Sequence, residues 1–409
     1  MRISFTVIAT AFLLFSLAAV SGKSRSAGVP PPLLKNELAL IRAIASREIQ
    51  AGRVPGAVVE IGQGGSVVYR DAFGYRMNPP GRSAMTPDTI FDLASLTKVV
   101  ATSVAIMQLR ESNKIELDAP VAQYWRAFGR NGKESITVRD LLTHYSGLAA
   151  DLNLGPSWQG YDAALRMIED QKPLDEPGTH YRYSDINFEA LGELVHRISG
   201  LSLDEYCRKF IFEPLGMAET SFRPPVSERN RIAPTGYAGG KLRVGEVHDP
   251  TAARMGGVAG HAGLFSTADD LAIFAQMMLD GGTWRGIRIL SRRSIIEMTD
   301  VESPAGAMHL RGLGWDLGTP LRSNRDHAAP IGSYGQTGFT GTMLWIDPTS
   351  TTFVIILSNR TYLTRVGDAG PLRQQILDLV SGLLGPLDEE RRMAHSPGRA
   401  RRGHASTLY

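Results

Sequence analysis

The sequence predicts an α+β fold in which both ends of the chain complete one antiparallel sheet and a mostly helical segment lies between them. Strand-like alternation of apolar and polar residues occurs early, and strand-like runs return only after residue 313. The segment between these regions is dominated by helical spacing of apolar residues. Strands at both ends with helices in the middle indicate a helix-flanked sheet and a helical subdomain at about residues 113–282.

The N-terminal part of the globular chain is expected to supply one helix and one hairpin. Leu33 to Gln50 carries apolar residues on one helical face. Gly56 to Ile61 and Ser66 to Phe73 then alternate on either side of Gln63-Gly64-Gly65, a composition typical of a tight turn. These two runs predict the first pair of strands.

The middle of the chain is expected to be mostly helical. A helix begins at Ser95, where apolar side chains recur every three or four residues. Thr137 is expected to cap a short helix that Gly147 ends. Three longer helices are predicted at Ile186–Ile198, Leu203–Phe212 and Ala268–Leu279.

The C-terminal part returns to strands and then closes with a helix at Leu372–Leu384. The globular domain is therefore expected to span residues 33–385. Residues 386–409 contain almost no apolar side chains and are expected to be a disordered tail. The four predicted strands are Gly314–Leu317, Gly332–Gly338, Thr342–Ile346 and Phe353–Leu357.

Residues 1–22 have the composition of a secretory signal peptide. Arg2 precedes an apolar run from Ile3 to Val20, with small residues near Ser21 that suit cleavage. Residues 23–32 are rich in Ser, Gly and Pro, as linkers are. A periplasmic or secreted protein is expected. The alternative is an uncleaved segment, the one route to membrane contact that the sequence suggests.

The overall charge excludes strongly charged partners. The net charge is +3 over 409 residues, and no basic patch or nucleic-acid-binding motif is present, so we expect no nucleic acid as partner. The single cysteine, Cys207, cannot form a disulfide within the chain. With 43% hydrophobic residues, the chain can bury a large core.

Ser95 and Lys98 form the first candidate catalytic pair. They stand three residues apart at the start of an apolar helix, so they share a face, and the first amides of a helix have no partner within it. Ser95 can therefore act as a nucleophile whose own amide binds the oxyanion, with the Lys98 amine one turn away. The spacing alone is weak evidence, because a serine N-cap followed by a lysine gives the same pattern.

Two later sequence motifs support a catalytic role for Ser95 and Lys98. Tyr183 stands in Tyr-Ser-Asp just before a helix, and Gln336-Thr337-Gly338 leads into a turn. With Ser-x-x-Lys, this order of motifs resembles the serine β-lactamase and penicillin-binding-protein superfamily, in the branch of class C β-lactamases, D,D-peptidases and related esterases. The resemblance covers residues 33–385 and implies a β-lactamase/transpeptidase-like fold without metal or organic cofactor.

The resemblance also implies a role for each group. Ser95 would be the nucleophile, while Lys98 and Tyr183 would share the handling of its proton. An ammonium favours a neighbouring phenolate, so either Tyr183 or a neutral Lys98 supplies the base, and the residues do not decide between them. Tyr181 is the alternative to Tyr183, which its place before Ser-Asp favours. The amides of Ser95 and Phe339 would bind the oxyanion.

Other hydrolase mechanisms lack their sequence signals. The chain contains neither a Gly-x-Ser-x-Gly elbow nor a His-Glu-x-x-His zinc motif. His144, His180 and His261 stand near predicted turns and are expected to be structural rather than catalytic.

Two residues depart from the usual pattern of the superfamily. Asp185 replaces an asparagine that donates to substrate, and its carboxylate should keep Lys98 protonated and favour Tyr183 as the base. The alternative is that Asp185 merely caps the following helix. Gln336 replaces a lysine or histidine, and a neutral amide binds a substrate carboxylate less well than a cation, which argues against an efficient β-lactamase.

The expected function is that of an exported serine hydrolase that acts through a Ser95 acyl-enzyme. Its partner would be a small-molecule or cell-wall-derived substrate, such as an ester, an amide or a peptidoglycan-derived peptide. Besides Asp185 and Gln336, the substrate-binding set would include Thr337, Gly338 and Phe339. The alternatives are a true class C-type β-lactamase and a penicillin-binding or sensor protein that acylates without turnover.

Overall fold

A computed structural model describes residues 32–33, 35–77, 83–155, 157–317, 333–363 and 367–384. The expected signal peptide, nearly all of the linker, the C-terminal tail and Gly332 lie outside the described residues. Among the described helices, none has the length and apolar character needed to cross a membrane.

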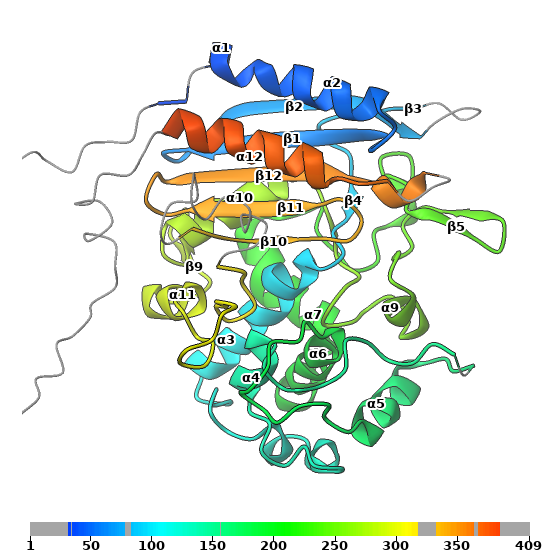
Figure 1. The fold of residues 1–409 in the computed structure, drawn as a ribbon, viewed down its shortest axis with the longest axis vertical. Helices are drawn as coiled ribbons and strands as arrows, with labels where there is room; N and C mark the ends of the chain where they lie inside the picture. Colours follow the sequence, from blue (N-terminus) through cyan, green and yellow to red (C-terminus); the bar gives the residue numbers. More distant parts are fainter. Residues whose placement is uncertain are drawn as a thin grey trace, which may run out of the picture.

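A six-stranded antiparallel sheet joins the two ends of the chain (Figure 1). The strand order is β10-β11-β12-β1-β2-β3, and Ala57 of β1 lies opposite Ser358 of β12. The prediction that both ends complete one sheet is therefore confirmed. The strands are β1 Gly56–Gln63, β2 Ser66–Met77, β3 Ser83–Ala84, β10 Tyr334–Thr337, β11 Met343–Asp347 and β12 Thr352–Ser358.

Helices cover both faces of this sheet, which explains why its central strands are apolar on both sides. The helices α2 (Leu40–Gln50) and α12 (Gly370–Leu384) lie along one face, and α10 (Ala268–Leu279) packs on the other (Figure 1). Successive side chains of a strand point to opposite faces. Val59 therefore joins the core under α2 and α12, while Val58 joins the larger core on the opposite side.

The helical part is built around α6 (Asp185–Ser199), which is buried from Ile186 to Val195. Ser184 caps its first turn by accepting from the amide of Asn187. Helices α3, α4, α5 and α7 pack against it. The remaining helices are α1 Lys35–Leu38, α3 Ser103–Glu111, α4 Val138–Thr143, α5 Tyr161–Asp170, α7 Leu203–Cys207, α8 Glu213–Leu215, α9 Pro250–Arg254 and α11 Arg292–Thr299.

Short two-stranded sheets complete the described fold. β4 pairs with β7 beside the nucleophile segment, and two hairpins pair β5 with β6 and β8 with β9. Their bounds are β4 Phe91–Asp92, β5 Gly236–Ala238, β6 Lys241–Arg243, β7 Phe265–Ser266, β8 Thr283–Trp284 and β9 Ile287–Arg288.

Two predicted helices have different ends in the structure. Thr137 caps α4 as predicted, but α4 ends at Thr143, with His144 as its C-cap, rather than at Gly147. His144 adopts the left-handed conformation with φ of 62°, which a glycine usually occupies. Its buried ring accepts a hydrogen bond from the amide of Ser184 at 3.1 Å, and this tertiary contact overrides the local preference. The helix predicted at Leu203–Phe212 becomes π-helical from Arg208 to Phe212.

The prediction of a strand at Gly314–Leu317 is wrong, because the structure has no strand there. Only Asp316 makes isolated bridges there, to Arg311 and Gly335. Gly314 has φ of 90°, and a Cβ atom at this position would lie 2.2 Å from Oγ of Ser103. The chain therefore turns over α3 at this glycine instead of extending. The helix predicted from Leu33 to Gln50 is likewise divided, into α1 and α2.

Candidate active site

The segment that carries Ser95 is held in a tight turn between β4 and the following helix. Ala94 has φ of 48°, an unfavourable conformation for alanine, and its amide donates to Oδ1 of Asp92 at 2.9 Å. The chain then enters a helical turn, with a π-helical stretch from Lys98 to Thr102. This geometry leaves the amide of Ser95 without a hydrogen-bond acceptor among the described residues.

Lys98 is fully buried, and three acceptors surround its ammonium group. Its Nζ atom lies 3.0 Å from Oγ of Ser95, 3.2 Å from the carbonyl oxygen of His261 and 2.6 Å from Oδ1 of Asp185. A protonated lysine has three N–H donors, so this environment matches an ammonium. The predicted proximity of Asp185 to Lys98 is present in the structure.

The electrostatics favour the charged form of Lys98. Burial by itself lowers the pKa of the amine, but the carboxylate of Asp185 and the phenol of Tyr183 outweigh burial and raise the pKa above its usual range. Asp185 reaches Lys98 from the first turn of α6, where Ser184 and not Asp185 is the capping residue. The alternative that Asp185 serves only as a helix cap is therefore wrong.

Tyr183 receives a hydrogen bond from the third motif. Nε2 of Gln336 donates to the phenolic oxygen of Tyr183 at 3.2 Å, and Gln336 is buried at 4% exposure. The ring of Tyr183 packs on His144 with a centroid distance of 4.4 Å. Nζ of Lys98 lies 4.9 Å from the ring centroid of Tyr183. Gln336 thus contacts a candidate catalytic group as well as lining the cavity.

Gly338 allows the end of β10 to approach the nucleophile segment. A Cβ atom at this position would lie 2.4 Å from the carbonyl oxygen of Leu93 and 2.1 Å from Oγ1 of Thr342. The amide of Gly338 itself donates to the carbonyl of Thr342 at 2.7 Å. The following amide, that of Phe339, has no acceptor within the described part of the chain. Both amides of the expected oxyanion hole are therefore available at one site.

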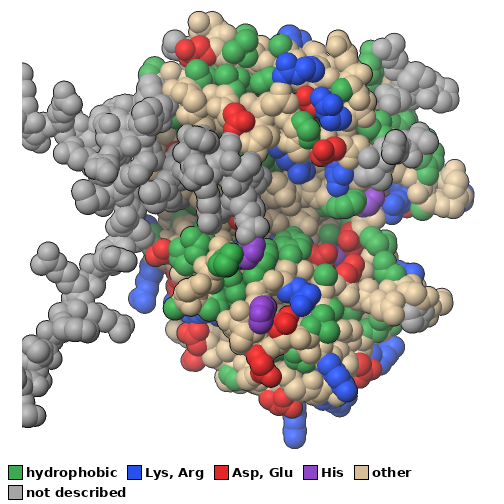
Figure 2. Space-filling model, in the orientation of Figure 1, with side chains coloured by type: hydrophobic (Ala, Val, Ile, Leu, Met, Phe, Trp, Pro, Cys, Tyr) green, Lys and Arg blue, Asp and Glu red, His purple; other side chains and the backbone are tan. Residues whose placement is uncertain are grey.

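One cavity of about 430 Å³ brings most of these residues together. On the face shown in Figure 2, the molecule is hollowed between the sheet and the helical part, with basic side chains on the sheet side. Lys98 and Asp185 lie behind Ser95 rather than in the lining. The cavity is lined by Ser95, Tyr181, Tyr183, Arg311, Asp316, Gln336, Thr337, Gly338, Phe339, Arg360 and Arg373.

Three arginines of this lining were not predicted from the sequence. Arg311 is neutralised by Asp316, with 3.2 Å between the charged atoms. Arg373 donates to the carbonyls of Gly338 at 2.7 Å and Thr342 at 2.9 Å, so it supports the turn after β10. These arginines belong to no local motif, and only the folded chain brings them to Ser95. The neutral Gln336 therefore shares its cavity with cationic side chains from other segments.

Arg360 and Arg373 carry positive charge that the carboxylate of Asp368 offsets only in part. Neither forms an ion pair within 4.0 Å in the described ranges. Burial and the neighbouring Arg360 lower the pKa of Arg373 to about 10, and burial also lowers the pKa of Arg360. The guanidinium of Arg360 lies 4.4 Å from the ring centroid of Phe339, which also stacks on His248. An anionic group bound here would relieve this excess positive charge.

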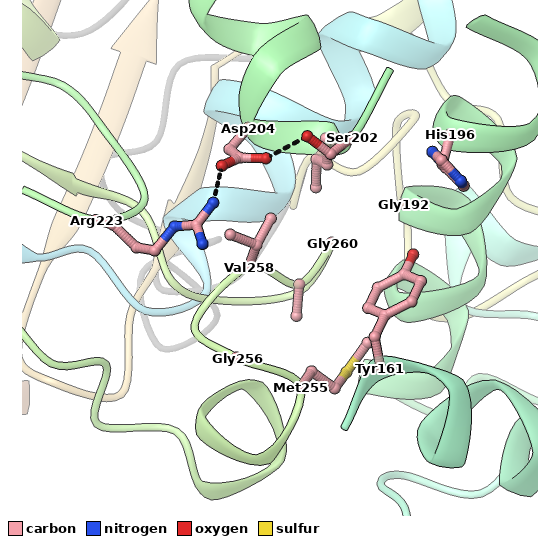
Figure 3. A pocket seen from close by; sticks show the side chains of 12 residues that line it. Tyr161, Gly192, His196, Ser202, Asp204, Arg223, Met255, Gly256, Val258 and Gly260 are labelled. Carbon is pink, nitrogen blue, oxygen red and sulfur yellow. Dashed lines mark hydrogen bonds and ion pairs between the residues drawn. The ribbon is translucent and has the colours of Figure 1, made fainter. Parts of the chain in front are cut away.

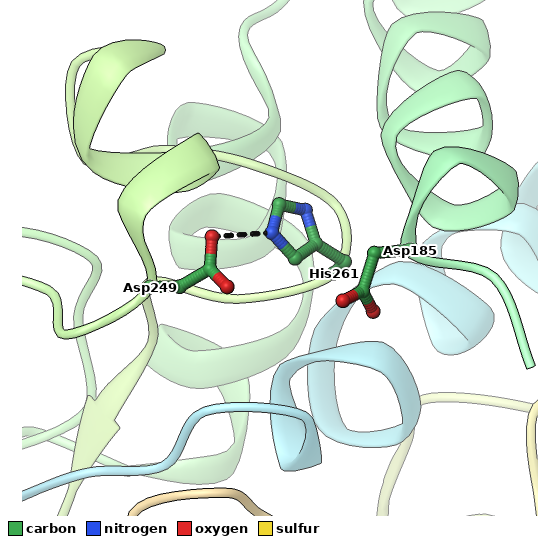
Figure 4. A group of neighbouring side chains, drawn as sticks. All are labelled: Asp185, Asp249 and His261. Atoms are coloured by element: carbon green, nitrogen blue, oxygen red, sulfur yellow. Dashed lines mark hydrogen bonds and ion pairs between the residues drawn. The ribbon is translucent and has the colours of Figure 1, made fainter. Parts of the chain in front are cut away.

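Asp185, Asp249 and His261 offer atoms within 4.8 Å of one another, close enough to share a cation (Figure 4). The protein's own cations already contact these carboxylates. Lys98 pairs with Asp185, and Nε2 of His261 lies 2.8 Å from Oδ1 of Asp249. The arrangement therefore fits an ion-pair cluster better than a metal centre.

A second cavity, of about 290 Å³, is lined in part by Met255, Gly256, Val258 and Gly260, which precede His261 in the chain (Figure 3). Tyr161, Leu203, Met255 and Val258 contribute to its largely apolar wall. None of the predicted site residues lines it. The chemistry is therefore concentrated in the cavity at Ser95.

Comparison with known proteins agrees with this fold and site. A family model described as "Beta-lactamase" matches residues 41–378. A protein of Escherichia coli O157:H7 named "Putative D-alanyl-D-alanine carboxypeptidase" is 32% identical over 355 residues, which cover 78% of this chain and 81% of that protein.

Solved structures show the same architecture. The octameric penicillin-binding protein homologue from Pyrococcus abyssi has a TM-score of 0.66 and 26% identity, covering 85% of this chain and 77% of that one. EstCE1, a hydrolase with promiscuous acyltransferase activity, has a TM-score of 0.70 and 22% identity, covering 85% and 99%. The fold is β-lactamase/transpeptidase-like, and the chain belongs to the β-lactamase family.

Proposed function

We propose that the chain is a serine hydrolase that cleaves peptides with a free C-terminal carboxylate through an acyl-enzyme on Ser95. The observation that carries this proposal is one cavity in which Ser95, with Lys98 behind it, faces Arg360 and Arg373. With residues 1–22 acting as a signal peptide, the enzyme would work in the periplasm or outside the cell on cell-wall-derived material.

Tyr183 is the proposed base. The ammonium of Lys98 already donates to Ser95 Oγ, so in this arrangement it has no lone pair with which to accept a proton. Lys98 and Gln336 both favour the phenolate of Tyr183, the first by its charge and the second by its hydrogen bond. Tyr183 would take the proton of Ser95 as Oγ attacks the substrate carbonyl.

The remaining steps use the same groups. The amides of Ser95 and Phe339 would bind the oxyanion of the tetrahedral intermediate. Collapse of this intermediate breaks the C–N bond, and Tyr183 returns its proton to the leaving amine. A water molecule then attacks the ester carbonyl while Tyr183 accepts a proton from it. The C–O bond of this ester then breaks, Tyr183 gives its proton to Oγ of Ser95, and the shortened peptide leaves as a carboxylic acid.

The substrate class follows from the arginines. A guanidinium binds a carboxylate with two parallel hydrogen bonds, a geometry that an ester or amide terminus does not reproduce. The name of the Escherichia coli relative indicates a D-alanyl-D-alanine carboxypeptidase. A peptide that ends in D-alanyl-D-alanine is therefore the proposed substrate type.

The test compares three substrates on the full chain. Release of D-alanine from diacetyl-L-lysyl-D-alanyl-D-alanine is measured beside the same peptide with a C-terminal amide and beside p-nitrophenyl acetate. We expect sustained turnover of the free acid, turnover at least about tenfold slower of the amide, and no turnover of any substrate by Ser95→Ala. Activity that survives in Ser95→Ala would contradict the mechanism.

An esterase is the second candidate, because Gln336 is neutral and Phe339 exposes an aromatic ring at the cavity. Rapid turnover of the p-nitrophenyl ester without D-alanine release would favour it. A burst of one equivalent without steady turnover would instead favour a sensor that acylates and does not deacylate. Efficient loss of a chromogenic cephalosporin would favour a true β-lactamase.

A further inference from the structure

The loop that contains His261 is attached to the nucleophile segment at several points. The carbonyl of Gly260 accepts from Oγ1 of Thr102 at 2.7 Å, and the carbonyl of His261 accepts from Nζ of Lys98 at 3.2 Å. Further along, the amide of Leu264 donates to Oγ1 of Thr97 at 3.1 Å. A displacement of this loop would therefore move an acceptor of Lys98.

The loop is also pressed against α6. A Cβ atom at Gly260 would lie 1.8 Å from the carbonyl oxygen of Phe188, so only glycine permits this approach. The contact brings His261 beside the first two turns of α6, which carry Asp185 and Glu189. The side chain of His261 thus lies among the charged groups that surround Lys98.

His261 is almost completely buried, and each ring nitrogen faces a carboxyl group. Nε2 lies 2.8 Å from Oδ1 of Asp249, and Nδ1 lies 3.5 Å from Oε1 of Glu189. Asp249 is itself fixed, because the same oxygen accepts from the amide of Ala252 and caps α9. Figure 4 shows the ring of His261 directed toward Asp249. Asp185 lies on the opposite side of His261.

The surrounding charges hold the ring in its cationic form at neutral pH. Burial lowers the pKa of His261, but Asp249, Asp185 and Glu189 outweigh burial and raise it to about 9. Burial raises the pKa of Glu189 to about 8, so at neutral pH Asp249 and Asp185 supply most of the negative charge beside the ring. Asp151, which accepts from Oγ1 of Thr251, also faces the cluster, and the ammonium of Lys98 interacts electrostatically with Asp249.

We propose that His261 is a positioning residue of the Ser95 reaction: its ion pair with Asp249 fixes the carbonyl that holds Lys98, and its ring adds a second positive charge beside Asp185, the partner of Lys98. This role rests on the proposed function. His261 does not contact Ser95 or Tyr183 and exchanges no proton with the substrate. Its carbonyl accepts a hydrogen bond from one N–H of the Lys98 ammonium. The other two N–H groups are then free to contact Asp185 and Ser95.

A merely structural histidine and a positioning histidine differ in their effect on the pH profile. Loss of a nearby positive charge disfavours any anionic base, so the acidic limb of the pH profile moves to higher pH. At a pH below the midpoint of the acidic limb, moving that midpoint up by one unit lowers the ionised fraction of the base about tenfold. Loss of packing alone slows the reaction at every pH by the same factor and leaves the midpoint in place.

The first experiment compares His261→Gln with wild type and with His196→Gln. His196 is an exposed histidine on α6 and serves as the matched control. The rate of phosphonylation of Ser95 by a fluorophosphonate probe is followed by intact mass from pH 5 to 10. We expect His261→Gln to react about tenfold more slowly at pH 7, with the acidic limb displaced by about one unit to higher pH. His196→Gln should follow the wild-type profile.

Two results contradict the proposal: an unchanged profile in His261→Gln, or slowing by one factor at all pH values. If wild-type Ser95 does not react at all, the proposed function fails instead. The state of the ring is then read independently, from the ¹⁵N shifts of the histidine side chains. A ring of His261 that loses its proton near pH 6.5 rather than near 9 overturns the proposal without reference to activity.

Asp249→Asn provides a second variant in case His261→Gln does not fold. Removal of the carboxylate lowers the pKa of His261, so the ring is charged only at lower pH. We expect a deficit of about tenfold in phosphonylation at pH 8 that becomes smaller toward pH 5.5. A rate equal to wild type at pH 8, or a deficit that does not depend on pH, contradicts the proposal.

Discussion

Nζ of Lys98 lies 2.6 Å from Oδ1 of Asp185, and the proposal that Tyr183 rather than Lys98 is the base beside Ser95 rests on this ion pair. The pair keeps the lysine protonated although its side chain is fully buried. A protonated lysine orients Ser95 and stabilises a phenolate but cannot accept a proton. The choice between Lys98 and Tyr183, open from the sequence, therefore favours Tyr183.

Replacement of Asp185 tests this pair. In Asp185→Asn the pKa of Lys98 should fall by about 1–3 units, because burial is no longer offset by a carboxylate. The activity of the variant should then decline at high pH, because its Lys98 loses a proton there while Lys98 of the wild type is still an ammonium. The measurement is the basic limb of kcat/KM from pH 7 to 11. Asp162→Asn, an exposed acid of α5, is the control, and equal limbs in the two variants would show that the coupling is absent.

Gln336 should affect the reaction rate through its hydrogen bond to Tyr183. In Gln336→Met the phenolic oxygen loses a hydrogen-bond donor, so the acidic limb of the pH profile should move to higher pH and kcat/KM at pH 7 should fall by about tenfold. The pH profile of p-nitrophenyl ester hydrolysis measures both effects, with the exposed Gln123→Met as control. A change in KM alone, with the acidic limb unmoved, would assign Gln336 to substrate binding only.

Arg360 should distinguish substrates by their terminal group. Arg360→Met keeps an aliphatic side chain against Phe339 but removes the charge, together with the hydrogen bonds to the carbonyls of Phe339 and Gly367. A charge-assisted hydrogen bond is worth about 1.5–3 kcal/mol, so KM for the free-acid peptide should rise by at least about tenfold. KM for the peptide amide should change little. Arg293→Met, at an exposed position of α11, is the control. Equal effects on acid and amide would exclude a carboxylate at Arg360.

Glu60 of β1 should make stability depend on pH. Burial, together with Asp269, raises the pKa of its carboxyl to about 7, although Arg70 acts in the opposite direction. The protonated acid is stable in the core below the pKa of the unfolded chain, near 4.5, and this contribution is lost as pH rises through 7. In Glu60→Gln the side chain cannot ionise, so stability should no longer fall as pH rises through 7.

The expected result for Glu60→Gln is stability similar to wild type at pH 4.5 and greater by a few kcal/mol at pH 8, since each pK unit corresponds to about 1.4 kcal/mol. Urea unfolding at both pH values measures the difference. The exposed Glu134→Gln should match wild type throughout. A constant difference between Glu60→Gln and wild type would mean that Glu60 does not titrate in this range.

The sequence predicted the parts of the fold that depend on local patterns. Alternation and turn residues placed the hairpin of β1 and β2, and apolar spacing placed α10 at its observed bounds. The spacing of Ser95 and Lys98, and the order of motifs after them, indicated the site because those residues sit at the starts of helices and at a strand end. The structure brings Ser95, Tyr183 and Gln336 to one cavity.

The remaining features depend on tertiary contacts that no local pattern shows. Arg311, Arg360 and Arg373 come from separate segments and meet only in the folded cavity. His261 stands in a glycine-rich turn, and its burial between Asp249 and Glu189 follows from the packing of that loop on α6. The left-handed His144 likewise results from its bond to Ser184 rather than from its own preference.

The acyl-enzyme on Ser95 is the central claim, and intact-protein mass spectrometry tests it most directly. Wild type is mixed with excess p-nitrophenyl acetate or benzylpenicillin, quenched in acid within seconds, weighed and digested. The account predicts one adduct of the mass of the acyl group, located on the peptide that contains Ser95, and no adduct in Ser95→Ala. An adduct on another residue, or hydrolysis of the ester by Ser95→Ala at the wild-type rate, would contradict it.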